Sequence, residues 1–184
     1  MNRGDLSEQF VSGEEIFRGG ILRLRRDVVR LPDGSQAVRE YVRHPGAVAI
    51  VALTGEGGVV LERQHRYPLG RDFVELPAGK LEPDEAHLET AQRELLEETG
   101  FAAELWQALG SFTANGNYGC GKVHLLYAQR ACKVVEPASG DLEEMEILEM
   151  RPSELLEAMK QGKVSLLGAA AAVALAYAHN RPKL

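Results

Sequence analysis

The sequence is poor in cysteine and in long apolar runs, and each shortage excludes a class of protein. It has two cysteines, Cys120 and Cys132, without a CxxC spacing, which are too few for a disulfide framework and are typical of a reducing compartment. The longest apolar stretch, residues 166–178, is alanine-rich and too short to span a bilayer. Residues 1–15 lack the apolar run of a signal peptide. We therefore expect a cytoplasmic protein with no membrane partner.

The sequence also lacks an excess of positive charge, since 27 acidic residues outnumber 21 lysines and arginines. The net charge is −6, the pI is near 5.4, and no run of five to eight lysines and arginines occurs, so duplex nucleic acid is excluded as an expected partner. An acidic enzyme that acts on an anionic substrate needs a bound cation or a few well-placed arginines. The chain of 184 residues is 45% hydrophobic, which is enough to bury the core of one main domain with a small appendage.

The pattern of apolar residues predicts an α+β protein. Alternation over residues 16–44, with a turn at 31–35, indicates an antiparallel strand pair at the N-terminus. We therefore divide the chain into residues 1–45, which hold this pair, and a main domain of residues 46–184. The main domain is predicted to contain a hairpin of strands 47–53 and 58–64, further strands at 106–112, 123–130 and 145–150, and helices at 84–99, 152–161 and 166–180.

The helix predicted at residues 84–99 is unusually rich in carboxylates. Leu88, Ala91 and Leu95 fall on one apolar face, and three glutamates share a neighbouring arc of the helix. These three are Glu94, Glu97 and Glu98. A solvated acidic face with ion pairs is the plain alternative, because Arg93 has i,i+4 spacing to acids on both sides.

Two features weigh against a merely solvated face. Glu94 and Glu98 are like charges at i,i+4, and the segment from Glu82 to Glu98 holds seven acids and only one arginine or lysine, Arg93. A hard cation with oxygen ligands would relieve this repulsion. Mg²⁺ or Mn²⁺ prefers such ligands when it also holds a phosphate.

The spacing of these residues resembles the signature box of the Nudix hydrolases at every specified position. It runs Gly79, five residues, Glu85, seven residues, Arg93-Glu94-Leu95, one residue, Glu97-Glu98, one residue, Gly100-Phe101. The resemblance implies a Nudix-type α/β/α sandwich with a mixed β-sheet, and hydrolysis of a nucleoside diphosphate linked to another moiety.

The same resemblance implies a role for each residue of the box. Glu94, Glu97 and Glu98 would bind Mg²⁺, with Mn²⁺ as the alternative, and the backbone carbonyl of Ala78 would be a further ligand. Glu97 and Glu98 would also be catalytic. Structural roles fall on Gly79, Glu85, Arg93 and Gly100, with Glu85 pairing with Arg93.

The segments 63–68 and 73–79 resemble the ADP-ribose and nucleotide-sugar pyrophosphatase branch of this family. By that resemblance Arg66 and Glu75 would bind substrate, although an ordinary strand-end arginine is an equal alternative. The N-terminal strand pair would be exchanged between the subunits of a homodimer. In the acidic stretch before residue 145, Glu143 is the candidate metal ligand and Asp141 the candidate general base, with a surface acidic loop as the alternative.

The segment 114–121 leaves the substrate open. ADP-ribose hydrolases of this branch usually carry a proline there, and this chain has none. Tyr118 stands where dinucleoside polyphosphate hydrolases of the family place a tyrosine, so it is a candidate for base stacking as well as for local packing. The leading hypothesis is a nucleotide-sugar pyrophosphatase. The alternatives are a dinucleoside polyphosphate hydrolase and an inactive nucleotide-binding module.

Overall fold

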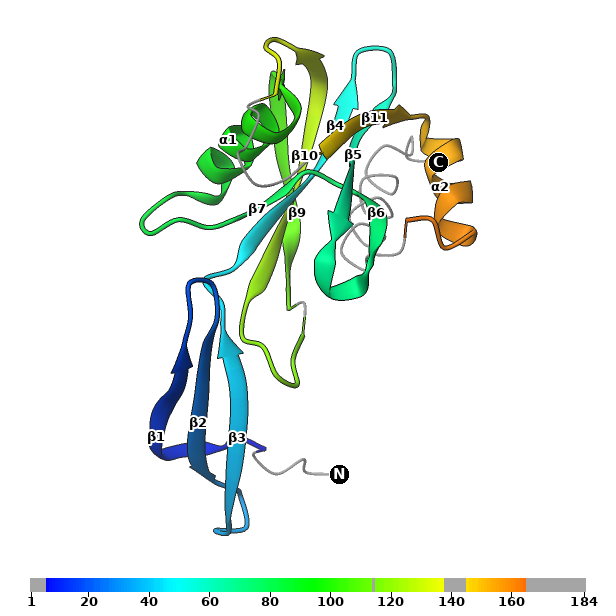
Figure 1. Cartoon of the computed structure of the whole chain (residues 1–184). Coiled ribbons are helices and arrows are strands. Elements are labelled where there is room, and N and C mark those ends of the chain that lie inside the picture. Colours follow the sequence, from blue (N-terminus) through cyan, green and yellow to red (C-terminus); the bar gives the residue numbers. More distant parts are fainter. Residues whose placement is uncertain (1–5, 114, 138–144, 165–184) are drawn as a thin grey trace, which may run out of the picture. The chain divides into compact units, whose positions relative to one another are not determined.

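The computed structural model describes residues 6–113, 115–137 and 145–164. The chain forms two compact units (Figure 1). The N-terminal unit comprises residues 1–45 and 113–121, and the main unit comprises residues 46–112 and 122–184. None of the helices in the described ranges combines the length and apolar character that crossing a bilayer requires.

The N-terminal unit is a three-stranded antiparallel sheet. Its order is β1 (Gln9–Arg18), β2 (Arg23–Arg30) and β3 (Gln36–Arg43). Strands β2 and β3 are the predicted pair, and the Asp33 carboxylate holds their turn by accepting from the Ser35 backbone N–H at 2.9 Å. Strand β1 was not predicted, because every one of its residues is exposed and its sequence carries no buried face.

The main unit is built on a mixed sheet whose centre is β4 (Ala47–Thr54). Strand β4 pairs parallel with β10 (Lys122–Lys133) and antiparallel with β5 (Val59–Arg66) and β7 (Ala78–Lys80). This confirms the mixed sheet and the hairpin predicted from the sequence. The outer strands are β6 (Arg71–Glu75) and β11 (Met145–Met150) beside β5, and β8 (Phe101–Ala102) and β9 (Leu105–Thr113) beside β10.

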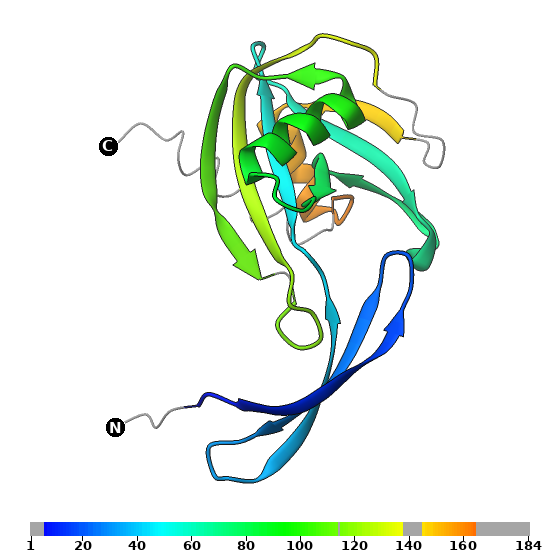
Figure 2. The ribbon, with the colours of Figure 1, turned by 90° about the vertical axis from the view of Figure 1, so that its left-hand side faces the viewer.

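Two helices cover opposite faces of this sheet (Figures 1 and 2). One face of β4 packs with Ala91 and Leu95 of α1 (His87–Thr99), and the other packs with Leu155 of α2 (Pro152–Lys160). Because both faces of β4 are buried, its sequence is a continuous apolar run rather than an alternating one. The layering is the α/β/α arrangement expected from the sequence.

Two details of the predicted helices differ from the structure, and one predicted helix cannot be compared with it. Helix α1 begins at His87 and not at Asp84, because Asp84 has a left-handed backbone with φ 64° that a helix does not accept. Leu88, predicted on the buried face, lies in the first turn and is 43% exposed. The helix predicted at residues 166–180 lies outside the described residues.

Candidate functional site

Strand β7 brings the main chain against two carboxylates of α1. Gly79 has room for no side chain, since a Cβ atom at this position would lie 1.8 Å from Cδ of Glu94 and 2.0 Å from its Oε1. The neighbouring Ala78 N–H donates to Oε2 of Glu98 at 3.1 Å. The Ala78–Gly79 step therefore places backbone next to both carboxylates, and the absence of a side chain at Gly79 leaves the space that the Glu94 carboxylate occupies.

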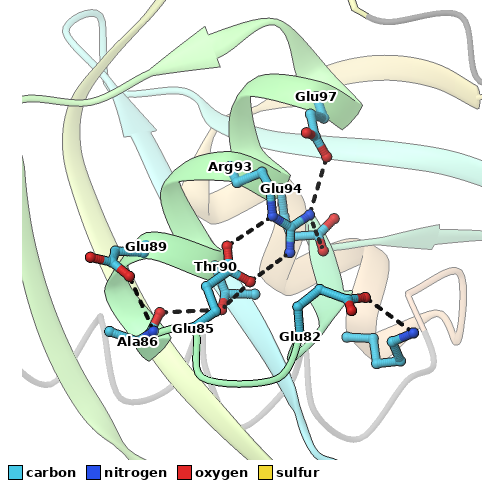
Figure 3. A network of polar contacts seen from close by, with 9 residues as sticks. Glu82, Glu85, Ala86, Glu89, Thr90, Arg93, Glu94 and Glu97 are labelled. Atoms are coloured by element: carbon cyan, nitrogen blue, oxygen red, sulfur yellow. Dashed lines mark hydrogen bonds and ion pairs between the residues drawn. The ribbon is translucent and has the colours of Figure 1, made fainter.

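Arg93 lies at the centre of a polar network on the same helix (Figure 3). Its Nε and Nη2 donate to the two carboxylate oxygens of Glu85, at 2.9 and 3.0 Å. Its Nη1 donates to Glu94 at 2.8 Å and to Glu97 at 3.1 Å. Thr90 Oγ1 donates to Glu85 at 3.0 Å from within the helix. One guanidinium thus ties the loop before α1 to two carboxylates of the helix.

Two of the three carboxylates that bind Arg93 have pKa values shifted in opposite directions. Hydrogen bonding from Arg93 lowers the pKa of Glu85 to about 2, and Thr90 adds to the effect. Burial raises the pKa of Glu94 above its ordinary value, and Arg93 only partly opposes this. An ionised Glu94 is therefore costly in this position, and a further positive charge beside it would be stabilising.

The sequence left two interpretations of the acidic helix, and the structure contains elements of the ion-paired one. Arg93 pairs with Glu97 at i,i+4, whereas Glu89 accepts from the Ala86 N–H and does not pair with Arg93. Across the described residues, no group of three His, Cys, Asp or Glu side chains is arranged to hold a metal ion. The donors are nevertheless carboxylate oxygens joined in one network, and such donors fit a hard divalent cation.

Arg66 and Glu75 form a second pair on the β5–β6 hairpin. Arg66 Nε and Nη2 donate to the two oxygens of Glu75 at 3.0 and 2.7 Å. The Glu75 side chain is only 4% exposed, whereas that of Arg66 is 40% exposed. The carboxylate is therefore an internal anchor, and the guanidinium is the member of the pair that solvent or a ligand can reach.

Three further residues, Tyr118, Asp141 and Glu143, are predicted for the site. Tyr118 belongs to the N-terminal unit, where its carbonyl accepts from the Val42 N–H at 2.9 Å and its side chain is 64% exposed. Asp141 and Glu143 lie outside the described residues. Within the main unit, the structure brings together Ala78, Gly79 and the box residues of α1.

Sequence reasoning missed several polar residues of this region. Thr90 is fully buried and binds Glu85, and Glu62 and Gln64 are buried in β5. A sequence signal existed for the last two, because Glu62, Gln64 and Arg66 alternate along a strand and must share one face. Thr90 had no such signal, since a threonine in a helix is usually read as an exposed or neutral position.

Two family models match the chain, one over most of the main unit and one over most of the N-terminal sheet. Residues 43–167 match the family described as NUDIX domain, and residues 8–42 match the nucleoside diphosphate sugar hydrolase N-terminal domain. The chain is 39% identical over 155 residues to an ADP-ribose pyrophosphatase of Bacillus subtilis (strain 168), covering 84% of this chain and 83% of that protein. It is 39% identical over 158 residues to a methanol dehydrogenase activator of Bacillus methanolicus, covering 85% of each.

The fold has a counterpart among solved structures. A crystal structure of an ADP compounds hydrolase superposes with a TM-score of 0.84 over 95% of both chains, at 21% identity. At that identity the likeness is evidence for the fold alone. It confirms the α/β/α sandwich that the signature box implied.

Proposed function

The chain belongs to the NUDIX family, and from this premise we propose that it hydrolyses ADP-ribose or a related nucleotide sugar to a nucleoside monophosphate and a sugar phosphate. The observation that carries the proposal is the carboxylate network of α1, closed against Gly79 and centred on Arg93. A second ADP-ribose pyrophosphatase among the relatives, from Mycobacterium tuberculosis (strain ATCC 25618 / H37Rv), is 48% identical over 101 residues, about half of each chain. Such names support the substrate class.

The divalent cation would be held by oxygens on both sides of the β7–α1 contact. Glu94, Glu97 and Glu98 are the side-chain ligands in this proposal, with the Ala78 carbonyl as a backbone ligand and Mg²⁺ as the ion. A bound cation would offset the negative charge that develops on the departing phosphate, and it would lower the pKa of a water molecule bound to it. Burial of Glu94 supports this assignment, because a cation would offset the cost of its buried negative charge.

The remaining roles are divided between orientation and proton transfer. Arg93 and Glu85 keep the loop before α1 fixed to the helix, so that the carboxylates of the helix face the substrate in one arrangement. Glu97 and Glu98 take part in catalysis. Asp141 is the general base and Glu143 a further metal ligand in the same proposal.

Substrate phosphate is bound by Arg66. A guanidinium whose orientation is fixed suits the paired oxygens of a phosphate. Glu75 acts on the substrate through Arg66, since both of its oxygens receive bonds from that guanidinium and its side chain is buried. Tyr118 is the candidate for base stacking if the substrate is a dinucleoside polyphosphate.

The N-terminal unit supports a homodimer. It exposes large apolar side chains that a monomer would leave in water, among them Phe10 at 65%, Phe17 at 55% and Ile21 at 85%. A second copy of the chain is the partner that we propose for this surface. Sedimentation equilibrium should give twice the 20.1 kDa of one chain, and a monomer at micromolar concentration would exclude the dimer.

The test of function is a product analysis with purified protein. Nucleotide sugars and dinucleoside polyphosphates are incubated with Mg²⁺, and the products are identified by chromatography. We expect a nucleoside monophosphate and a sugar phosphate from ADP-ribose. Glu98→Gln should lower kcat by about 100-fold or more, which is typical when one transition-state contact is removed.

Glu104→Gln is the matched control, because Glu104 is an exposed carboxylate paired with Arg130 on another part of the main unit. It should leave kcat unchanged. Nucleotide binding without turnover of any substrate would favour the inactive module. Turnover confined to dinucleoside polyphosphates would favour the second enzyme activity and reject ADP-ribose.

A further inference from the structure

The β5–β6 hairpin carries a polar strip on the face of the sheet that α1 covers. In the register of the two strands, Arg66 lies opposite Arg71, and Glu62 lies opposite Glu75. Partners in an antiparallel pair share one face. Val60, two residues before Glu62, packs in the cluster with α1, so that the strip continues the α1 face.

Each arginine at the end of this strip is held in place by a buried neighbour. Glu75 fixes Arg66 through two hydrogen bonds. The guanidinium of Arg71 lies over the ring of Phe73, 4.5 Å from its centre, and Phe73 is only 4% exposed. These contacts restrict the orientation of both arginine side chains, so that less side-chain entropy is lost when a ligand binds.

Among the side chains that the structure describes, two arginines at this end of the hairpin share one carboxylate. Like charges directly opposite each other on paired strands, as on Arg66 and Arg71, are destabilising. Glu75 compensates only the charge of Arg66. In the part of the chain that the structure describes, the side chain of Arg71 lies on the Phe73 ring and makes no hydrogen bond or ion pair. In a protein of net charge −6, this pair of arginines is a local concentration of positive charge.

The strip also leads toward the carboxylate network. Glu75 ends β6, and only Leu76 and Pro77 separate it from Ala78, whose N–H binds Glu98. Three residues of extended chain span at most about 11 Å. The guanidinium of Arg66, which is bonded to Glu75, therefore lies on the part of the hairpin that leads to these carboxylates, and the guanidinium of Arg71 lies over Phe73, two residues before Glu75.

We infer that Arg71 is a second substrate-contact residue, which together with Arg66 binds the diphosphate of the nucleotide. This inference rests on the proposed function, and it adds a residue to the proposed substrate site. Arg66 is anchored by a carboxylate and Arg71 by an aromatic ring, so that the two guanidiniums present donors to neighbouring phosphate oxygens. The competing explanation is that Arg71 only shields Phe73 from water.

The experiment compares three variants of Arg71 with a matched control. Arg71→Gln removes the charge, Arg71→Met removes the charge but keeps an unbranched apolar cover over Phe73, and Arg71→Lys keeps the charge. The control is Arg63→Gln, because Arg63 lies on the opposite face of β5 and is paired with Glu146 at 2.6 Å. Calorimetric binding of ADP in Mg²⁺ buffer is measured beside the KM and kcat for ADP-ribose, and thermal unfolding checks that each variant is folded.

We expect the Kd for ADP and the KM for ADP-ribose to rise roughly 10-fold to 100-fold in Arg71→Gln and Arg71→Met, the range for a lost charged hydrogen bond. The kcat should change much less, Arg71→Lys should recover part of the loss, and Arg63→Gln should bind ADP like wild type. Wild-type affinity for ADP in Arg71→Met would show a packing role and overturn the inference.

The two proposals can fail separately. If wild type hydrolyses no nucleotide sugar but binds ADP, and Arg71→Gln binds it at least about 10-fold more weakly, the function is wrong and the diphosphate site stands. If wild type hydrolyses ADP-ribose and Arg71→Gln does so with unchanged KM, the site is wrong and the function stands. Wild type that does not bind ADP overturns the site directly.

Discussion

The substitution Gly79→Ala isolates the contact between β7 and Glu94. Its Cβ atom would lie 1.8 Å from Cδ of Glu94 and 2.3 Å from Oε2, well inside any van der Waals distance. Gly79 pairs with Val48 in the centre of the sheet, so the backbone cannot easily retreat. The Glu94 carboxylate is the end of a flexible side chain and is the part that moves.

Displacing Glu94 should affect stability and activity very differently. The lost bond from Arg93 contributes about 1.5–3 kcal/mol at most. Part of that loss is offset because the buried carboxylate regains solvent, as its raised pKa indicates. We therefore expect the free energy of unfolding to fall by less than about 2 kcal/mol. The kcat/KM should fall by about 100-fold, as for the removal of one transition-state contact.

The assay is steady-state hydrolysis of ADP-ribose with Mg²⁺, together with urea unfolding. Gly55→Ala is the control, because a Cβ atom at Gly55 would have no neighbour within 4 Å. In the double variant with Glu94→Gln, the effects of Gly79→Ala on activity should not add, since both changes act on one side chain. A Gly79→Ala enzyme within about threefold of the wild-type kcat/KM, a difference well under 1 kcal/mol, would refute the reasoning.

Two further predictions concern α1. The pKa of Glu85 lies at about 2 in the folded protein against an ordinary 4.5, so its ion pair with Arg93 stabilises the fold above pH 4.5 and is lost as the pH falls toward 2. Urea unfolding should therefore show a difference in the free energy of unfolding between wild type and Glu85→Gln that becomes smaller as the pH falls through this range. A difference that stays constant would contradict the prediction. Leu95→Ala should lower the free energy of unfolding by about 2–5 kcal/mol, because Leu95 is fully buried. Leu96→Ala is the matched control, since Leu96 is 38% exposed; equal losses in the two variants would contradict the packing assignment.

Local patterns were sufficient for the elements that carry a periodic signal. The continuous apolar run of β4 and the capped, acidic α1 were both predicted, because burial on two faces and helix termination leave marks in adjacent residues. Strand β1 has no buried face and left no such mark. The start of α1 was misplaced for a similar reason, since the left-handed backbone of Asp84 is not encoded in its residue type.

The sequence alone determined the family, the fold class and the set of box carboxylates. The reason is that the box is defined by spacing along the chain, and residues at helical spacing lie on one side of a helix whatever packs against it. Only the tertiary structure decided which carboxylate is buried and what each arginine contacts. Glu94 lies under Gly79 because β7 packs on α1, and Arg66 meets Glu75 because of the register of β5 and β6. Such contacts join residues that are distant along the chain, and strand register and packing fix them.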